Sequence, residues 1–214
     1  MTAQISDTVK YREKPRAVAG INGSGLFDPA QHGVQPVTIS TACWRGYHCT
    51  YEVADGSLFL TRLNIGLGEE DRSRAERGEG PVLFGQVPRR YTERGHRVNL
   101  RTNEVTTHWE SSDFRIDNLR EVIPFTGGLL LGADFIRAMY VHMGFHPAYK
   151  FETVHELVFD AGRLVEEHDR SAQMAEFRAM LSARSLEPGA GASREEIERW
   201  VKRCFSLEYR GLRA

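Results

Sequence analysis

The sequence predicts an α+β fold, mainly an antiparallel β-sheet of hairpins, with two C-terminal amphipathic helices. Two turn signals, Asp55-Gly56 and Asp160-Ala161-Gly162, indicate the sheet, because each lies between runs rich in β-branched and aromatic residues. Two apolar stripes with helical spacing after residue 170 indicate the helices. Strands and helices that are separated along the chain are typical of the α+β class.

The first hairpin is expected over about 44–65, because Asp55-Gly56 readily adopts the positive φ angles of a tight turn. The second is expected to have strands over 154–159 and 163–167. There Gly162 supplies the left-handed position of a three-residue connection. These two hairpins are the strongest local predictions.

The rest of the chain before residue 170 is less regular. Strand-like runs are separated by polar residues or by Gly and Pro, and they lie at 81–87, 98–100, 105–109 and 122–131. The charged stretch 66–80 has too few apolar side chains to offset the entropy of ordering, so we expect an exposed, mobile loop. The Gly-rich stretch 20–29 has no helix start behind it and is expected to be a flexible turn. Residues 135–143 match helical spacing and strand patterning almost equally, and a short helix is expected.

Two helices are expected to end the chain. The first covers about 171–183, and the second begins with a capping box formed by Ser193 and Glu196. The apolar stripe of the second helix consists of Ile197, Trp200, Val201, Cys204 and Phe205. We expect one domain over 1–214, in which a β-rich body (1–170) carries a helical pair (171–214).

Charge and hydropathy limit the partners and the location of the protein. The net charge of −1 over 214 residues gives no global field that attracts nucleic acid or acidic membranes. The N-terminal stretch lacks the apolar run of a signal peptide, and no segment reaches the roughly 18 apolar residues of a membrane helix. We therefore expect a cytoplasmic protein without a membrane partner.

The cysteines favour a structural role. Three cysteines are an odd and sparse set, unlike a disulfide framework. On one strand, Cys43 and Cys49 would be about 20 Å apart, beyond the roughly 7 Å Cα limit for a bridge. His48 would lie on the opposite face from both thiols, so no local catalytic dyad is indicated and buried thiols are expected.

Trp44, Arg45 and Tyr47 are the first candidate binding residues. An arginine beside aromatic rings can stack on them and still present a planar fork to a carboxylate or phosphate. Gly46 in a strand often marks the close approach of another backbone or of a ligand. The alternative is that Arg45 pairs with an acidic neighbour across the strands.

His142 and His146 are the second pair of candidates, because their i, i+4 spacing places two imidazoles on one helical face. Gly144 and Pro147 oppose such a helix, and the glutamate of a zinc hydrolase motif is missing. We therefore predict no metal or other cofactor and keep both histidines as binding candidates.

A cluster of arginines surrounds Tyr91 and raises the question of nucleic-acid binding. Its members are Arg89, Arg90, Arg94, Arg97 and Arg101. Glu93 interrupts the cluster, and the acidic residues of 69–79 are available to pair with it. Nucleic-acid binding is therefore not expected.

Two runs, TACWRGYHCTYEVADGSLFL and YVHMGFHPAYKFETVHELVFDAGRLV, resemble a family of small uncharacterised bacterial proteins. The similarity lies in a Thr-Ala-x-Trp-Arg-Gly-Tyr strand and a Tyr-Val-His-Met-Gly segment. The matching positions are Thr41, Ala42, Trp44 to Tyr47, Leu58, Leu60 and Tyr140 to Gly144. This resemblance implies a bacterial protein and a strand at 135–143, but it brings no activity, cofactor or catalytic residue.

Two functions are consistent with these features. The favoured one is a non-catalytic binding or regulatory protein of the bacterial cytoplasm, such as an immunity or defence-associated partner protein, that binds another protein through Trp44, Arg45 and Tyr47. The alternative is an enzyme on a nucleotide or other phosphate-bearing substrate, with Arg45 as anion clamp and His142, His146 or Glu156 as acid or base. The enzyme requires Arg45 and a histidine to converge on a concave pocket, whereas the binding protein requires an exposed Trp44 or Tyr47.

Overall fold

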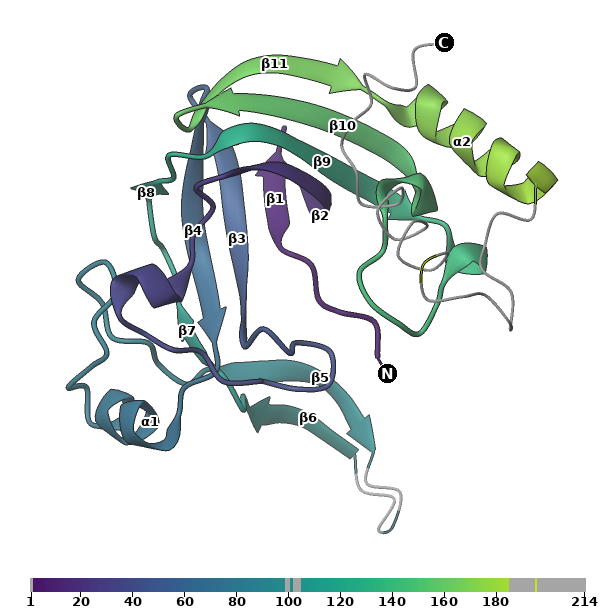
Figure 1. Cartoon of the computed structure of the whole chain (residues 1–214). Helices are drawn as coiled ribbons and strands as arrows, with labels where there is room; N and C mark the ends of the chain where they lie inside the picture. The colour runs from purple at the N-terminus through teal and green to yellow at the C-terminus, as the bar shows by residue number, and fades with distance from the viewer. Residues whose placement is uncertain (1, 99–100, 102–104, 185–194, 196–214) are drawn as a thin grey trace. The chain divides into compact units, whose positions relative to one another are not determined.

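The computed structural model describes residues 2–98, 101, 105–184 and 195 (Figure 1). Among the described residues that have regular structure, most lie in β-strands. The others form two α-helices and three short 3₁₀ helices. The strands are β1 (Thr8–Tyr11), β2 (Lys14–Ser24), β3 (Tyr47–Ala54), β4 (Ser57–Ile65), β5 (Thr92–Val98), β6 (Val105–Glu110), β7 (Phe114–Ile116), β8 (Glu121–Val122), β9 (Thr126–Phe135), β10 (Phe151–Asp160) and β11 (Arg163–Asp169). The helices are α1 (Glu69–Glu76), α2 (Ser171–Arg184), η1 (Pro29–His32), η2 (Arg137–Met139) and η3 (Ala148–Lys150). The predicted α+β class is confirmed.

The chain forms two compact units. The first contains the described residues of Met1–Phe27, Thr50–Leu60 and Val122–Ala214, and the second contains those of Asp28–Cys49 and Thr61–Glu121. Strands β3 and β4 each carry residues of both units. The single domain expected over 1–214 stays a prediction.

The sheet of the first unit is mixed and not purely antiparallel. Strands β11, β10, β9, β2 and β1 pair antiparallel in that order, but β1 pairs in parallel with β3, with Thr8 opposite Thr50. A parallel pair needs a long connection, and here β2 and the chain after it supply one. The strand order closes on itself, because β11 also pairs with β4 at Arg163 and Ser57.

Both predicted hairpins are confirmed. Between β3 and β4, Asp55 (φ 51°) and Gly56 (φ 69°) form a two-residue turn with positive φ angles. Between β10 and β11, Ala161 (φ 45°) and Gly162 (φ 85°) form the second. The second loop has two residues and not three, because its preceding aspartate already pairs with Arg163.

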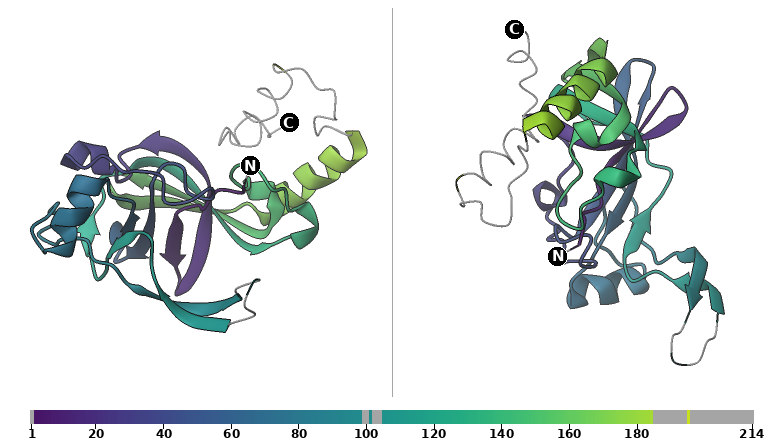
Figure 2. Two further views of the ribbon diagram at one scale, coloured as in Figure 1. Left: turned by 90° about the horizontal axis from the view of Figure 1, so that it is seen from below. Right: turned by 90° about the vertical axis from the view of Figure 1, so that its right-hand side faces the viewer.

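One core of the first unit lies where α2 packs against β10 and η3 (Figure 2). Its buried members are Ala19, Leu130, Ala148, Tyr149, Phe151, Val154 and Met174. Arg178 of α2 donates hydrogen bonds from Nη1 to the carbonyl oxygens of Tyr149 (3.0 Å) and Phe151 (2.8 Å). The helix predicted over about 171–183 corresponds to α2. The second predicted helix, at 193–205, lies outside the described residues except for residue 195.

The second unit has two strand pairs of its own. The later residues of β4 pair with β7, with Leu63 opposite Ile116, and β5 pairs with β6. The strand predicted at 105–109 is confirmed by β6. Of the strand predicted at 98–100, Val98 is the last residue of β5, and residues 99–100 lie outside the described residues.

Two segments expected to be a mobile loop and a flexible turn contain regular elements, although most of 69–79 is exposed as expected. Stretch 66–80 contains α1, whose first turn holds three acidic residues that interact favourably with the helix dipole. Ala75 of α1 is buried, which fixes the helix to the unit despite its high charge. The expected flexible turn at 20–29 begins inside β2, which continues to Ser24 and pairs with β9.

Three other predictions also need correction. Residues 81–87 form no strand; a bridge joins Leu83 and Gln86 around a tight turn. Run 122–131 is broken, because β8 ends at Val122 and β9 begins at Thr126. Residues 135–143 form no α-helix, since β9 continues to Phe135 and the 3₁₀ helix η2 follows it.

Candidate functional site

The segment 37–46, named the Trp44 loop here, holds the first candidate residues. Its last residues, 43–46, were expected to belong to the strand of the first hairpin, but β3 begins only at Tyr47 and the residues before it turn. The amide of Ile39 donates to the carbonyl of Cys43 (3.2 Å), and the amide of Cys43 donates to the carbonyl of Ser40 (3.0 Å). The hydroxyl of Thr38 donates to the carbonyl of Trp44 (3.1 Å). Hydrogen bonds within the loop therefore hold its shape.

The glycine of this loop lies against another backbone, as its sequence context predicted. The Gly46 carbonyl accepts a hydrogen bond from the Gly66 amide (2.8 Å), and the Gly66 carbonyl accepts one from the Val37 amide (2.9 Å). A Cβ atom at either glycine would come within 2.5 Å of the Val37 carbonyl oxygen. The loop is thus anchored to the end of β4.

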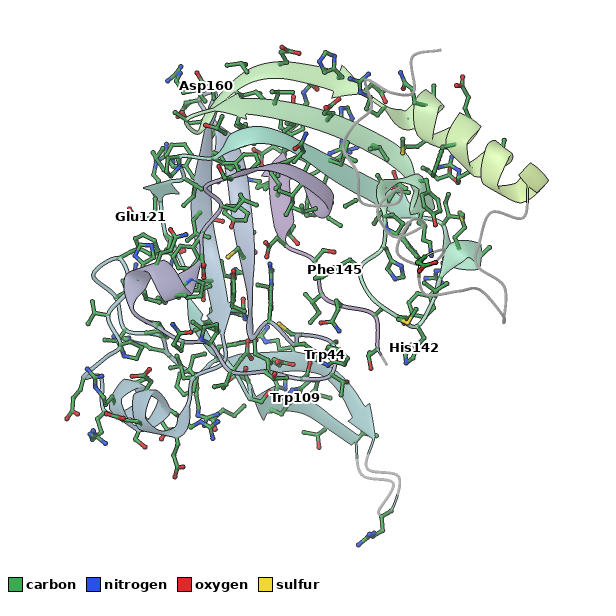
Figure 3. All side chains as sticks on the ribbon, viewed as in Figure 1. Trp44, Trp109, Glu121, His142, Phe145 and Asp160 are labelled. Carbon is green, nitrogen blue, oxygen red and sulfur yellow. The ribbon has the colours of Figure 1, made fainter. Side chains whose placement is uncertain are left out.

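Trp44 projects from this loop with 54% of its surface exposed (Figure 3). Such exposure is unusual for a large amphipathic ring, which is usually well buried. Val37, on the same loop, is also exposed. The loop therefore presents apolar side chains on a well-ordered backbone.

The side chain of Arg45 makes two contacts with Tyr47, just after the end of its own loop. Its Nε donates a hydrogen bond to the carbonyl oxygen of Tyr47 at 2.6 Å. Its guanidinium carbon lies 4.6 Å from the centre of the Tyr47 ring, which is a cation–π contact. Both contacts are made to Tyr47, two residues further along the chain.

The cysteines near this loop are buried free thiols, as predicted. Cys43 Sγ lies 3.5 Å from the carbonyl oxygen of Tyr47. The alternation of β3 places His48 and Cys49 on opposite faces, as expected for neighbouring strand residues. The third cysteine of the sequence, Cys204, lies outside the described residues.

His142 and His146 belong to the first unit, whereas Trp44, Arg45 and Tyr47 belong to the second. His142 is exposed, and its Nδ1 lies 2.9 Å from the hydroxyl oxygen of Tyr140. Four large apolar side chains near His142 in the chain are also exposed, namely Tyr140, Val141, Met143 and Phe145. Figure 3 labels His142 and Phe145. This stretch forms an exposed apolar surface of the first unit.

His146 is half-buried among aromatic rings. Its ring centre lies 4.6 Å from that of Phe135 and 5.3 Å from that of Tyr140. Burial, followed by the charge of Lys150, lowers the pKa of His146 below its usual value of 6.5. The imidazole of His146 therefore packs among these rings and favours its neutral form.

One arginine of the cluster around Tyr91 has structural partners. Arg90 pairs with Glu76 of α1 (2.9 Å) and donates to the carbonyl oxygen of Ser111 (2.9 Å). Its guanidinium also lies over the ring of Phe114. The pairing with the acidic stretch 69–79 that the sequence suggested therefore occurs at this arginine.

A buried polar network in the second unit was missed by sequence reasoning. The carboxylate of Asp113 accepts hydrogen bonds from the Tyr91 hydroxyl (3.0 Å) and the Asn64 amide (3.0 Å). The Ser111 hydroxyl contacts the same carboxylate. Burial raises the pKa of the Tyr91 hydroxyl, so it remains a donor at neutral pH. The members come from three separate stretches, and no spacing rule joins them.

A second polar group was missed in the first unit, on β1, β2, β10 and β11. It consists of Tyr11, Arg16, His155, Glu167 and Asp169, together with Arg12 of the turn after β1. Arg12 Nη2 lies 2.8 Å from Glu167 Oε2, and His155 Nδ1 lies 3.5 Å from Glu167 Oε1. No sequence signal indicated it, because β1 and β2 were not predicted.

Two absences apply to the part of the chain that the structure describes. It contains no group of three or more histidine, cysteine, aspartate or glutamate residues placed to hold a metal ion. None of its helices combines the length and the apolar character that crossing a membrane requires.

Comparison with known proteins gives no relative. No family model, curated protein or solved structure matches the chain. The geometry of the chain itself is therefore the guide to its function.

Proposed function

We propose that this protein is a non-catalytic binding protein of the bacterial cytoplasm that regulates or neutralises a protein partner through the Trp44 loop. The observation that carries the proposal is the 54% exposure of Trp44 on a loop held by hydrogen bonds. Tryptophan is enriched among the residues that dominate binding energy at protein interfaces. A loop that is already ordered loses little conformational entropy on binding.

Arg45 supports this loop directly. It donates Nε to the Tyr47 carbonyl and stacks on the Tyr47 ring. Arg45 thereby stiffens the loop beside Trp44. The expected partner is a protein with an apolar pocket that accepts the Trp44 indole, with Val37 at its margin.

Site-specific photo-crosslinking identifies this partner. A photoreactive amino acid replaces Val37 in the Trp44 loop, and in a control protein it replaces Val82, which is exposed in the same unit. We expect one host protein to crosslink from position 37, and Trp44→Ala to remove that crosslink. Equal crosslinking from positions 37 and 82 would contradict a specific surface.

A titration with the purified partner then measures the contribution of Trp44. Trp44→Ala is expected to weaken Kd at least about 30-fold, equivalent to about 2 kcal/mol, the size typical of an interface hot spot. Val82→Ala is expected to leave Kd unchanged. An unchanged Kd for Trp44→Ala would exclude the loop as the binding surface.

A further inference from the structure

Several polar side chains of the first unit lie on one face of its sheet. The pairing of Val9 with Arg16 and of His155 with Asp169 places each pair on a common face. Val18, two residues after Arg16, lies opposite Leu131, and Leu131 lies opposite His155. Side chains two residues apart on a strand share a face. This face carries Tyr11, Arg16, His155, Glu167 and Asp169, and also Lys14, which pairs with Tyr11 and is exposed at the solvent end of β2.

The sheet curves toward this face. Tyr11 on β1 and His155 on β10 are separated by β2 and β9, which places them about 14 Å apart in a flat sheet. Their ring centres are nevertheless only 6.1 Å apart, in an edge-to-face arrangement. Arg12, just after β1, likewise reaches Glu167 on β11. The curvature brings polar groups from both ends of this part of the sheet together.

Arg16 is the unusual member of the group. Only 7% of its surface is exposed, and its Nε and Nη1 atoms are buried without a hydrogen-bond partner among the residues that the structure describes. A buried charge normally has hydrogen-bonded partners, because desolvation of an unpaired ion is strongly unfavourable. The Nε and Nη1 groups of Arg16 are therefore available to donate hydrogen bonds to a bound anion.

The nearby carboxylates are committed to other groups. Asp169 accepts a hydrogen bond from the Ser171 amide (2.9 Å), and Glu167 pairs with Arg12. Hydrogen bonds from Ser171, with smaller contributions from the charges of His155 and Arg16, lower the pKa of Asp169 below its usual value of 3.8. Arg16 is therefore close enough to influence Asp169, yet neither its Nε nor its Nη1 donates a hydrogen bond to that carboxylate.

We propose that Arg16, with Tyr11 and His155, forms a binding site for a small monocarboxylate. A single guanidinium matches one negative charge, and Glu167 and Asp169 on the same face repel a dianion such as phosphate more strongly than a monoanion. The neighbouring Val18, Leu131 and the Tyr11 ring suit an apolar body attached to the carboxylate. This site is separate from the Trp44 loop and does not depend on the proposed protein partner.

Calorimetric titration of the full-length protein with sodium benzoate, sodium acetate and sodium phosphate, at constant ionic strength, tests the site. We expect saturable 1:1 binding of benzoate, weaker binding of acetate and no binding of phosphate. Arg16→Gln is expected to weaken benzoate binding at least about tenfold. Lys14→Gln, which removes an exposed positive charge from the same strand, is expected to have no effect.

Two results of this titration would overturn the proposal. Tighter binding of phosphate than of benzoate would exclude the monocarboxylate. No saturable binding of any of the three anions, or the same loss for Lys14→Gln as for Arg16→Gln, would exclude the site.

Thermal unfolding of Arg16→Met separates ligand binding from a structural role. An unpaired buried guanidinium does not stabilise the ligand-free protein, so this variant is expected to keep or raise Tm without ligand. Benzoate raises the Tm of the wild-type protein by mass action, and the variant is expected to lose that rise. A markedly lower Tm for ligand-free Arg16→Met would show that Arg16 already has a structural partner, and would overturn the proposal.

Discussion

Gly46 lies directly against the backbone of Val37, where a Cβ atom at position 46 would come 2.5 Å from the Val37 carbonyl oxygen. Gly46 also has a φ angle of 79°, which residues with a Cβ atom rarely adopt. Both the conformation and the contact therefore require glycine. Since Val37 and Trp44 belong to the same loop, this contact and the loop's hydrogen bonds together support the backbone that carries the exposed indole.

Gly46→Ala is expected to lower the free energy of unfolding by about 2–4 kcal/mol, because a methyl group must displace the Val37 backbone in addition to the strain at positive φ. Urea unfolding followed by tryptophan fluorescence and circular dichroism measures this loss.

Gly56→Ala is the matched control for this prediction. Gly56 also has a positive φ angle (69°), but nothing lies within 4 Å of the position of its Cβ atom. Gly56→Ala is therefore expected to lower the free energy of unfolding only by the cost of a positive φ angle, about 1 kcal/mol. An equal decrease in the free energy of unfolding in the two variants would show that the contact with Val37 does not contribute to stability.

The hairpins could be predicted from the sequence because their turn chemistry is local. Asp55-Gly56 and Ala161-Gly162 are residue pairs that readily adopt the positive φ angles observed in both turns. The close approach of another backbone at Gly46 is one of two alternatives suggested by a glycine within a strand, although the structure places Gly46 before β3 and not within it.

Strands β1 and β2 could not be predicted, because their partners lie far away along the chain. Their sequence, TVKYREKPRAVAGINGS over 8–24, is broken by charged residues and a proline and lacks clean alternation. Parallel pairing with β3 and antiparallel pairing with β9 define them as strands. The group around Arg16 was missed for the same reason, since Tyr11 and His155 meet only through curvature of the sheet.

A second glycine, Gly132 of β9, leaves room for an aromatic ring in the core beneath α2. A Cβ atom at position 132 would lie 2.5 Å from Cγ of Phe151. Gly132→Ala is expected to cost about 1–3 kcal/mol through overpacking, with no contribution from a positive φ angle. Urea unfolding measures the loss.

A double-mutant cycle tests whether the ring of Phe151 causes that loss. Phe151→Leu removes the ring that the methyl group would strike, although it also loses the packing of Phe151 on Phe135. The double variant is expected to be more stable than the sum of the two single losses by at least about 1 kcal/mol. Simple additivity would mean that the ring is not what excludes a side chain at position 132.

The buried network around Asp113 is expected to stabilise the second unit. Asp113→Ala leaves the Tyr91 hydroxyl and the Asn64 amide without their acceptor, and the expected loss is about 3 kcal/mol. Asp117→Ala is the control in the same unit, because Asp117 forms an exposed pair with Arg62. That pair is expected to contribute at most about 1 kcal/mol. Similar losses from chemical unfolding of the two variants would contradict a special role for the network.

His146 is expected to make stability depend on pH in mildly acidic solution. Burial lowers its pKa in the folded protein below the usual 6.5, so the folded state favours the neutral imidazole. As pH falls below 6.5, the unfolded chain binds a proton that the folded protein does not, and the free energy of unfolding declines until the folded pKa is passed. His146→Gln is expected to flatten this decline in urea unfolding measured at a series of pH values. His142→Gln, which removes an exposed imidazole from the same segment, is expected to keep the wild-type slope. A slope that is unchanged in His146→Gln would assign the pH dependence to other groups.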